Sequence, residues 1–419
     1  MPRDIYNTKS ALNASNLKFI YQKYNGPVWV YEAETIINQI KQLQQFDVVR
    51  FAQKACSNLH ILRLMKCHGV KIDSVSLGEI ERALLAGFQS GYGADEIVFT
   101  ADMFELSTLS KVLEYKITVN IGSIDMLIQL GSYSPGHKIW LRINPGFGHG
   151  HNYKTNTGGK DSKHGIWYKD LPQAVEYVKY YNFKLIGFHM HIGSGVNYRY
   201  LSEVCDAMVQ QTLICDQDFM SISAGGGISV PYRFEDKNID IQHYFSLWDN
   251  ARQRISQYLK HPISLEIEPG RFIVAEAGVL VSQVRAVKFV DHRYFVLVDV
   301  GFNDFVRPVM YGSYHHVSLL PVDNRDIFSG PFYNTVIGGP ICESGDLFTQ
   351  DSDGKIISRQ LPLAKVGDYL IFHDTGAYGS SMSSNYNSRP LLPEVLLERG
   401  EIRQIRRKQL FQELFILEQ

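Results

Sequence analysis

The sequence contains no apolar run approaching the ~20 residues that a membrane-spanning helix needs. Its charges show no excess of one sign either, since 42 lysines and arginines stand against 43 aspartates and glutamates, for a formal net charge of -1. Without a basic surplus or a charged tail, nothing indicates nucleic acid or a membrane surface as a partner. Residues 1–26 lack the apolar core of a signal peptide, and we therefore expect a cytoplasmic protein.

Cysteine is scarce, and its spacing suggests no pairing. The five cysteines are scattered without a C-x-x-C motif: Cys56, Cys67, Cys205, Cys215 and Cys342. An odd number of isolated cysteines predicts reduced thiols and not a disulfide framework. The sequence also lacks G-x-G-x-x-G after its first strand-like run, which disfavours a dinucleotide-binding Rossmann domain.

Short apolar runs alternate with amphipathic stretches over the first two thirds of the 419 residues. The strand-like runs lie at 48–52, 72–76, 96–100, 117–121, 138–143, 185–191, 219–223 and 264–268. Helical patterns between them include 200–214 and 241–259, and another precedes them at 33–45. Eight strand–helix units predict parallel strands with right-handed crossovers, and thus an α/β fold of the (β/α)8 TIM-barrel type.

The pattern changes after residue 275. Runs at 278–287, 294–299 and 369–373 are typical of antiparallel strands, and the next convincing helix is at about 407–417. A chain longer than the ~250–300 residues of one core is expected to hold two domains. We therefore place a barrel domain at 33–275 and a C-terminal antiparallel β-rich domain at 276–419. An N-terminal strand at about 27–31 is expected to belong to the β-rich domain.

Polar residues or glycines follow nearly every predicted barrel strand, whereas the strand interiors are apolar. They are Lys54, Asp73, Thr100, Asn120, Asn144, His189 with His191, Gly225 to Gly227, and Glu268. Because catalytic groups of such barrels lie at the carboxyl ends of the strands, these residues predict one shared site. The Gly-, His- and Lys-rich stretch 147–165 after the fifth strand is a candidate lid or binding loop.

Lys54 stands out because it ends an apolar strand. A buried lysine is costly unless it has a partner or loses its charge, and a neutral amine can form an imine with an aldehyde. Lys54 is therefore either a buried ion-pair partner or a covalent anchor for a carbonyl cofactor. The glycine run 225–227 is compatible with a phosphate site or with a plain tight turn.

Two other strand ends also admit two interpretations. Glu266 and Glu268 point the same way, and Arg271 lies one turn beyond. These residues form either an internal Glu–Arg pair or a functional group, in which a carboxylate keeps a pyridine nitrogen protonated beside an arginine that binds an anion. His189 and His191 share a strand face, where they could bind a metal or stack on a planar cofactor. A metal would need more ligands than Asp73 alone, since the loop histidines His149, His151 and His164 are not fixed in place.

Candidate groups also occur in the β-rich domain. Cys342 lies in a glycine-punctuated turn with polar flanks, which suits a proton donor or nucleophile better than a core thiol. Arg307, Tyr311 and Tyr378 supply an arginine and two tyrosines suited to binding a carboxylate or a phosphate.

Together these groups resemble the site of the fold type III, alanine-racemase-like decarboxylases that use pyridoxal 5'-phosphate, and most of all the diaminopimelate decarboxylases. The matching motifs, in chain order, are Phe51-Ala-Gln-Lys-Ala-Cys-Ser-Asn58, His189-Met-His-Ile-Gly-Ser194, Glu268-Pro-Gly-Arg271, Cys342-Glu-Ser-Gly-Asp346 and Ser384-Asn-Tyr-Asn-Ser-Arg-Pro390. The match runs from about residue 27 to the C-terminus.

The resemblance implies a role for each matching residue at the cofactor. Lys54 looks like the lysine that joins pyridoxal phosphate, His191 like the group that stacks on its ring, and Glu268 like the partner of its pyridine nitrogen. The other positions of the implied cofactor site are Asp73, Ser194, Gly227, Pro269, Gly270, Arg271 and Tyr378. Cys56 departs from the family, whose members commonly carry asparagine there.

The resemblance also implies how a substrate is bound and protonated. The family's substrate-binding positions match Arg271, Arg307, Tyr311, Glu343 and Tyr378. Cys342 matches a thiol that protonates the carbanion and that comes from the partner subunit, which implies a homodimer with shared sites.

The implied reaction is the pyridoxal-phosphate-dependent decarboxylation of meso-2,6-diaminopimelate to L-lysine and carbon dioxide, the last step of lysine biosynthesis, without a metal. Ornithine, arginine and carboxynorspermidine remain alternative substrates. A metal-dependent barrel hydrolase and a non-catalytic binding protein are the alternatives from other classes.

Overall fold

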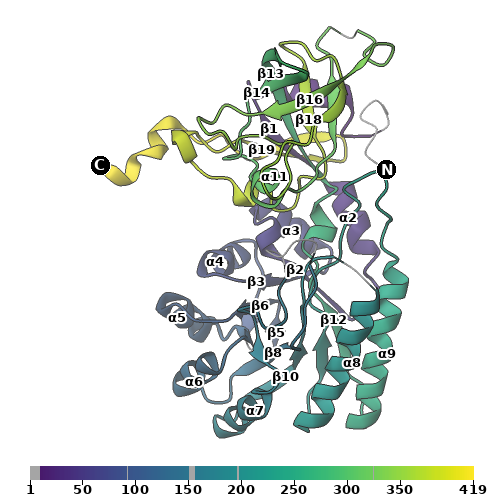
Figure 1. Cartoon of the computed structure of the whole chain (residues 1–419). Coiled ribbons are helices and arrows are strands. Elements are labelled where there is room, and N and C mark those ends of the chain that lie inside the picture. The colour runs from purple at the N-terminus through teal and green to yellow at the C-terminus, as the bar shows by residue number, and fades with distance from the viewer. Residues whose placement is uncertain (1–9, 92, 151–155, 196–197, 324) are drawn as a thin grey trace. The chain divides into compact units, whose positions relative to one another are not determined.

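The computed structural model describes residues 10–91, 93–150, 156–195, 198–323 and 325–419 (Figure 1). By its internal contacts the chain divides into two compact units. The barrel unit comprises residues 38–229 and 238–273, and the sheet unit comprises residues 1–37, 230–237 and 274–419.

All eight predicted barrel strands form. They are β2 (Val48–Ala52), β3 (Lys71–Ser74), β6 (Ile97–Ala101), β7 (Thr118–Ile121), β8 (Lys138–Asn144), β10 (Lys184–His189), β11 (Ser221–Ser223) and β12 (Ser264–Ile267). Each pairs in parallel with its neighbours, and the pairings of β8 with β10 and of β12 with β2 close the ring. The predicted (β/α)8 barrel is confirmed.

Helices alternate with these strands and lie around the outside of the barrel (Figure 1). They are α2 (Ala33–Lys41, within which the division between the units falls), α3 (Leu59–Cys67), α4 (Leu77–Leu85), α5 (Leu106–Tyr115), α6 (Ile124–Tyr133), α7 (Leu171–Tyr180), α8 (Tyr198–Cys215), α9 (Ile241–Leu259) and the short α10 (Arg271–Val274). Side-chain caps begin several of them, since Ser76, Ser123 and Asp240 each accept a hydrogen bond from the backbone N–H three residues on. Short strands β4 (Ser90–Gly91), β5 (Ala94–Asp95) and β9 (Ile166–Trp167) complete the unit.

Side chains alternate between the two faces of each barrel strand. The fully buried apolar residues Phe51 and Leu265 lie on one face, next in sequence to Arg50 and Glu266, which pair with each other on the other face. Further polar side chains stand at the carboxyl ends, where the loops begin. This distribution fits a barrel whose body stabilises the fold and whose rim carries the chemistry.

The sheet unit is built on a nine-stranded mixed sheet. Its strands are β1 (Val28–Glu32), β13 (Gly278–Val290), β14 (Arg293–Val298), β15 (Val317–Leu320), β16 (Phe332–Gly338), β17 (Arg359–Pro362), β18 (Tyr369–Phe372), β19 (Glu394–Glu398) and β20 (Glu401–Arg406). Most pairs are antiparallel as predicted, but β1 with β19 and β14 with β16 are parallel. Both parallel pairs join strands that are distant in sequence, so no hairpin turn imposes an antiparallel arrangement on them.

Helix α1 (Ala14–Lys23) was not anticipated from the sequence. Asn13 caps it, and Leu17 and Ile20 pack with Val279 and Val281 in the core of the sheet unit. The hydrophobic contacts with a sheet that is formed much later in the chain stabilise this short helix.

The predicted helix at about 407–417 is wrong. The structure has two short 3-10 turns there, η5 (Phe411–Leu414) and η6 (Ile416–Glu418). Most apolar side chains of this segment are exposed, with Leu417 97% accessible. Without a core to cover one face, a helix this short is only marginally stable. The remaining short elements of the unit are α11 (Arg307–Tyr311), η3 (Ser380–Met382) and η4 (Tyr386–Ser388).

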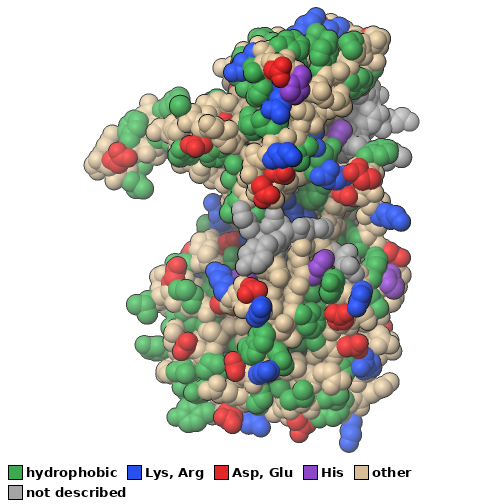
Figure 2. Space-filling model, viewed as in Figure 1, with side chains coloured by type: hydrophobic (Ala, Val, Ile, Leu, Met, Phe, Trp, Pro, Cys, Tyr) green, Lys and Arg blue, Asp and Glu red, His purple; other side chains and the backbone are tan. Residues whose placement is uncertain are grey.

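The surface agrees with the balanced composition. Figure 2 shows basic and acidic side chains interspersed over the visible face, without a broad region of one sign. Among the residues described, no helix combines the length and the apolar character needed to cross a membrane.

Candidate active site

Lys54 lies in the 3-10 turn η1 (Gln53–Ala55), directly after β2. Its neighbours Gln53 and Ala55 are buried, and Gln53 Nε2 donates to the Glu79 carbonyl oxygen at 2.8 Å, which ties the turn to α4. Lys54 itself is exposed. The predicted alternative of a buried ion-pair partner is therefore wrong, because the turn η1 leaves the lysine exposed.

Asp73 lies at the end of β3, which pairs with β2. Its side chain is buried, and burial raises the pKa of Asp73 to about 6, with Glu268 acting in the same direction and Lys54 against it. Asp73 Oδ1 has no hydrogen-bond partner among the described residues. A buried carboxylate oxygen without a hydrogen-bond partner can accept a hydrogen bond from a polar group of a ligand.

Glu268 follows β12, which pairs with β2 on the opposite side from β3. Its carboxylate accepts hydrogen bonds from His189 Nε2 at 2.8 Å and from Ser223 Oγ at 3.0 Å. Burial acts to raise the pKa of Glu268, but the charge and hydrogen bond of His189 outweigh it and lower the pKa to about 2. Glu268 is thus an ionised, oriented carboxylate.

The two histidines predicted to share a strand face have different surroundings. β10 ends at His189, whose Nε2 is bonded to Glu268 and whose buried Nδ1 has no partner in the described part of the chain. His191 lies beyond the strand, and burial, with the charges of Arg142 and Lys54, lowers the pKa of its imidazole well below the usual value. His191 is therefore neutral, which suits stacking on a planar ring. No group of three or more His, Cys, Asp or Glu side chains within the described ranges is arranged to hold a metal ion.

The glycine run after β11 forms a turn that only glycine accommodates. Gly225 and Gly227 have φ values of +60° and +98°, and Gly195 N donates to the Gly227 carbonyl oxygen at 2.9 Å. A Cβ atom on Gly227 would lie 2.3 Å from the Gly193 carbonyl oxygen and 3.3 Å from His191 Cε1. Two backbone turns thus approach each other beside His191, and Ser194 belongs to one of them. Such backbone concavities favour anions.

Replacing Gly227 with alanine is expected to weaken binding of the pyridoxal phosphate that the sequence resemblance implies at least tenfold, and to destabilise the fold by about 1–3 kcal/mol. The added Cβ must push the two turns apart, and an L-residue is strained at this φ. Cofactor titration and denaturant unfolding measure the two effects. Gly78 is the matched control, because it lies in α4 and a Cβ there meets nothing closer than 4.0 Å. If Gly227→Ala bound the cofactor as tightly as wild type does, the turn would not be part of the phosphate site.

The Glu268-Pro-Gly-Arg271 segment packs against the turn that carries Lys54. A Cβ atom on Gly270 would lie 3.0 Å from Ala55 Cβ and 3.1 Å from the Ala52 carbonyl oxygen. Glycine therefore permits the close approach of this segment to the lysine-bearing turn. Arg271 begins α10 and is 9% exposed.

Glu266 forms a Glu–Arg pair with an arginine of the neighbouring strand, Arg50. Glu266 Oε2 is 2.7 Å from Arg50 Nε, between the neighbouring strands β12 and β2, and both side chains are buried. Glu266 therefore belongs to a structural ion pair, which leaves Glu268 as the carboxylate of the site.

Arg142 on β8 is a functional candidate that the sequence analysis missed. It is 7% exposed, and burial lowers the pKa of its guanidinium against the opposing charges of Asp102 and Glu268. A charged residue inside the apolar run 139–143 was the available signal, of the same kind that drew attention to Lys54.

The loop 147–165 is anchored at several points, and its residues 151–155, with His151, lie outside those described. Asn144 Oδ1 accepts from Gly159 N at 2.9 Å, and Thr157 Oγ1 donates to the His191 carbonyl oxygen at 3.0 Å. His164 Nδ1 is 2.6 Å from Asp102 Oδ2. The expectation that the loop histidines are not fixed is therefore wrong for His164, and the lid function stays a prediction.

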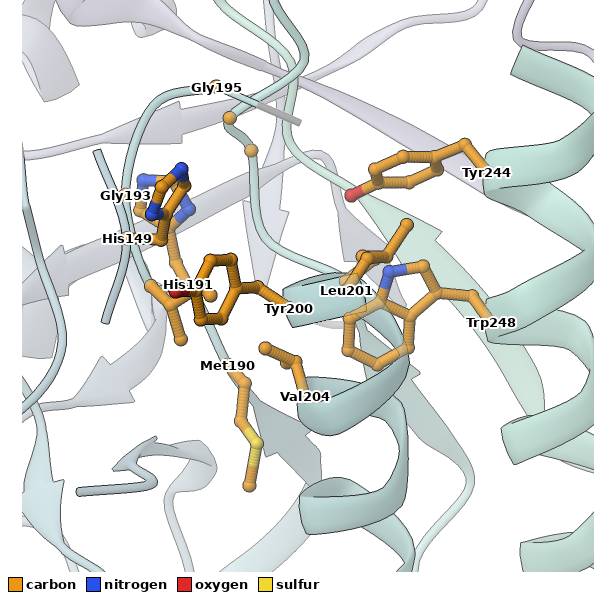
Figure 3. Close-up of a pocket in the computed structure, with 14 residues that line it drawn as sticks. His149, Met190, His191, Gly193, Gly195, Tyr200, Leu201, Val204, Tyr244 and Trp248 are labelled. Atoms are coloured by element: carbon orange, nitrogen blue, oxygen red, sulfur yellow. The ribbon is translucent and has the colours of Figure 1, made fainter. Parts of the chain in front are cut away.

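A pocket adjoins the glycine turns within the barrel unit (Figure 3). Figure 3 shows Tyr200, Leu201 and Val204 from α8 and Tyr244 and Trp248 from α9 around it. Its remaining lining comes from His149, Met190 to Gly193, Gly195, Ala224, Gly226 and Gly227. The rings of His149 and Tyr200 stack at 4.5 Å. The pocket places the neutral imidazole of His191 beside the backbone turns.

In the sheet unit, Arg307 is surrounded by aromatic rings. Its Cζ lies 5.9 Å from the ring centre of Tyr311 and 5.7 Å from that of Tyr378. Arg307 is only 6% exposed, and Tyr378 has a left-handed φ of +56°. The structure thus brings together three predicted substrate-binding residues in one cluster. Strain at a non-glycine residue is typical of functional positions.

Cys342 and Glu343 form a second group in the sheet unit. Cys342 is exposed, its N–H donates to Asn387 Oδ1 at 3.0 Å, and Glu343 accepts from Tyr386 Oη at 3.2 Å. The buried Asp346 accepts from Ile341 N at 2.8 Å and so shapes the turn. The motif therefore combines one structural carboxylate with an exposed thiol.

The barrel rim suits pyridoxal phosphate in several respects. Lys54, Asp73 and Glu268 follow or end three adjacent strands, and glycine turns leave room that a Cβ would fill. Asp73 Oδ1 and His189 Nδ1 are among the buried polar atoms of the described rim that lack a partner. The amine of Lys54 suits the aldehyde of the cofactor, the carboxylate of Glu268 suits its pyridine nitrogen, and the glycine turns suit its phosphate.

Comparisons with known proteins agree with this composition of the site. Residues 33–275 match the family model described as "Pyridoxal-dependent decarboxylase, pyridoxal binding domain". The diaminopimelate decarboxylase of Escherichia coli K12 is 59% identical over 418 residues, which cover 100% of both chains.

Solved structures give the same result. A crystal structure of a diaminopimelate decarboxylase has a TM-score of 0.97 and 58% identity, and the match covers 100% of this chain and 99% of that one. The Helicobacter pylori diaminopimelate decarboxylase complexed with L-lysine has a TM-score of 0.82 and 30% identity, with 96% and 99% covered. The chain belongs to the diaminopimelate decarboxylases, within the pyridoxal-dependent decarboxylase family.

Proposed function

We propose that the chain decarboxylates meso-2,6-diaminopimelate to L-lysine and carbon dioxide, the last step of lysine biosynthesis, with pyridoxal phosphate as its cofactor. The observation that carries the proposal is the set of Lys54, Asp73 and Glu268 on three adjacent strands. It occurs in a chain 59% identical over its full length to a diaminopimelate decarboxylase.

The residues at the barrel rim supply what the cofactor needs. When bound, pyridoxal phosphate supplies an aldehyde that condenses with amines and a conjugated ring that accepts the electron pair left by the departing carboxylate. Lys54 would hold it covalently, Glu268 would keep its ring nitrogen protonated, and neutral His191 would cover its ring. Its phosphate would bind at Ser194, Gly227 and Gly270, and the other contacts would come from Asp73, Pro269, Arg271 and Tyr378.

The sheet unit supplies groups for the distal end of the substrate. Arg307 offers fixed N–H donors in an aromatic surrounding, with Tyr311 and Tyr378 beside it. A guanidinium binds a carboxylate through two parallel hydrogen bonds, which selects diaminopimelate over amines without a distal carboxylate. Arg271 and Glu343 are further proposed contacts to the substrate.

Cys342 would donate the proton that replaces the lost carboxylate on the substrate carbon. An exposed thiol on a turn can reach outward from its own subunit, so we further propose that it acts in the site of the partner and that the protein is a homodimer. A cytoplasmic location belongs to the same proposal, because all five cysteines are free thiols.

Replacing Glu268 with glutamine is expected to lower kcat about 100-fold while pyridoxal phosphate still binds. Glutamine keeps the shape but not the negative charge that would hold a proton on the ring nitrogen. Steady-state kinetics and cofactor absorbance separate the two effects. Ser223→Ala removes one hydrogen bond to the same carboxylate and should cost less than about tenfold. An unchanged kcat in Glu268→Gln would contradict the role.

The function is tested with purified protein and pyridoxal phosphate, incubated separately with meso-diaminopimelate, ornithine and arginine. Carbon dioxide is followed, and the amine product is identified. Lysine from diaminopimelate alone is expected. Carbon dioxide from ornithine or arginine instead would overturn the substrate, and none from any of them would overturn the reaction.

A further inference from the structure

We propose that His315 is a positioning residue that fixes the guanidinium of Arg307 for the distal carboxylate of the substrate. The inference rests on the proposed function, and it identifies a residue that determines specificity but does not itself touch the substrate. His315 belongs to the sheet unit and lies between α11 and β15.

The hydrogen bonds of His315 define its protonation state. Its Nδ1 is 3.0 Å from the carbonyl oxygen of His373, which can only accept, so Nδ1 carries a hydrogen. Arg307 Nε donates to His315 Nε2 at 3.3 Å. Since an arginine nitrogen can only donate, Nε2 must be the acceptor. His315 is thus a neutral imidazole in a single tautomer.

The packing of His315 leaves its ring little freedom. The side chain is 3% exposed. The Phe305 ring lies edge-on to it at 4.6 Å, and the Tyr232 ring does so at 5.0 Å. A ring held by two aromatic neighbours and by a backbone carbonyl is a rigid support for whatever bonds to Nε2.

This support fixes the plane of the Arg307 guanidinium. Arg307 Nε bonds to His315, and Nη2 donates to Ser313 Oγ at 3.3 Å. Both acceptors come from the few residues after α11. Arginine loses considerable rotamer freedom when it binds a ligand, and orientation in advance removes most of this cost.

A neutral acceptor is well suited to this position. A carboxylate beside Arg307 would also orient it, but it would neutralise the charge that attracts the substrate carboxylate. The imidazole holds the guanidinium without cancelling its charge. The histidine thus orients the guanidinium without placing a negative charge beside it.

Two substitutions at His315 separate the hydrogen bond to Arg307 from packing. His315→Asn can still donate at the Nδ1 position but cannot reach Arg307, whereas His315→Gln places an amide oxygen near the Nε2 position. We expect His315→Asn to raise the KM for diaminopimelate at least tenfold with kcat within a few-fold of wild type, and His315→Gln to recover most of the loss. His316→Asn, the same change one residue along, is the control and should leave KM unchanged.

Inhibition constants for L-lysine and for cadaverine, its analogue without a carboxylate, provide a carboxylate-specific measurement. Wild type should bind lysine more tightly, and His315→Asn should lose this preference at least tenfold. Equal weakening of both inhibitors, or an unchanged KM in His315→Asn, would overturn the positioning role. If wild type prefers lysine to cadaverine and His315→Asn keeps the same preference, only this inference is rejected. A wild type that releases no carbon dioxide from diaminopimelate rejects the proposed function and this inference together.

Discussion

Replacing Lys54 with alanine is expected to lower the decarboxylation of diaminopimelate at least ~10⁴-fold, the largest effect of any single change to the chain. Lys54 is the exposed amine at the end of β2, with the buried carboxylates Asp73 and Glu268 on the strands to either side. Alanine removes the amine that would hold the cofactor and take part in releasing the product. Nothing else in the turn η1 can replace it, since neither Gln53 nor Ala55 carries an amine.

Borohydride reduction followed by peptide mass analysis tests the covalent role directly. Wild type should carry the reduced cofactor on the peptide that contains Lys54, and Lys54→Ala should carry none. Lys71→Ala is the control, because Lys71 begins β3 and lies at the amino end of a neighbouring barrel strand. A reduced cofactor on any peptide of Lys54→Ala would show that another lysine holds it.

The sequence was sufficient for the barrel because its signals are local. Each strand is a short apolar run, each helix an amphipathic one, and the polar residue after a run predicts a position on the rim. Lys54, Asp73 and Glu268 all follow from this pattern alone. The structure adds the closure of the ring, which pairs β12 with β2 and so makes the strands that precede Glu268 and Lys54 neighbours.

The electrostatic partners could not be predicted in the same way. Glu268 is bonded to His189, 79 residues earlier, and Glu266 is paired with Arg50, 216 residues earlier. Such pairs depend on the register between strands and on which side chains face inward, and neither is encoded in a local pattern. The exposure of Lys54 was missed because the residues directly after β2 form the 3-10 turn η1, which the apolar run 48–52 does not indicate.

The sheet unit was harder to predict than the barrel. Helix α1 is stabilised by contacts with strands more than 250 residues away, such as those of Ile20 with Val279. The segment 407–417 has apolar residues at helical spacing but no surface of the core to pack against. In both cases tertiary contacts, which local propensity does not report, decide the conformation.

Replacing Cys342 with alanine is expected to lower kcat about 1,000-fold, in the range for loss of a general acid, while cofactor binding is unchanged. The thiol is exposed on a turn held by Asp346 and Asn387, so alanine should leave the turn intact. Cys67→Ala, at another exposed cysteine, is the matched control and should retain full activity. Turnover at the wild-type rate in Cys342→Ala would remove the thiol from the chemistry.

The partner-subunit role of Cys342 makes a separate prediction that mixing can test. Neither Lys54→Ala nor Cys342→Ala is active alone, but a hybrid dimer would combine an intact Lys54 from one chain with an intact Cys342 from the other. Random reassociation of equal amounts should therefore restore about a quarter of wild-type activity, because half of the dimers are hybrids with one complete site each. If both residues act within one chain, no mixture recovers activity, because every chain still lacks one of them.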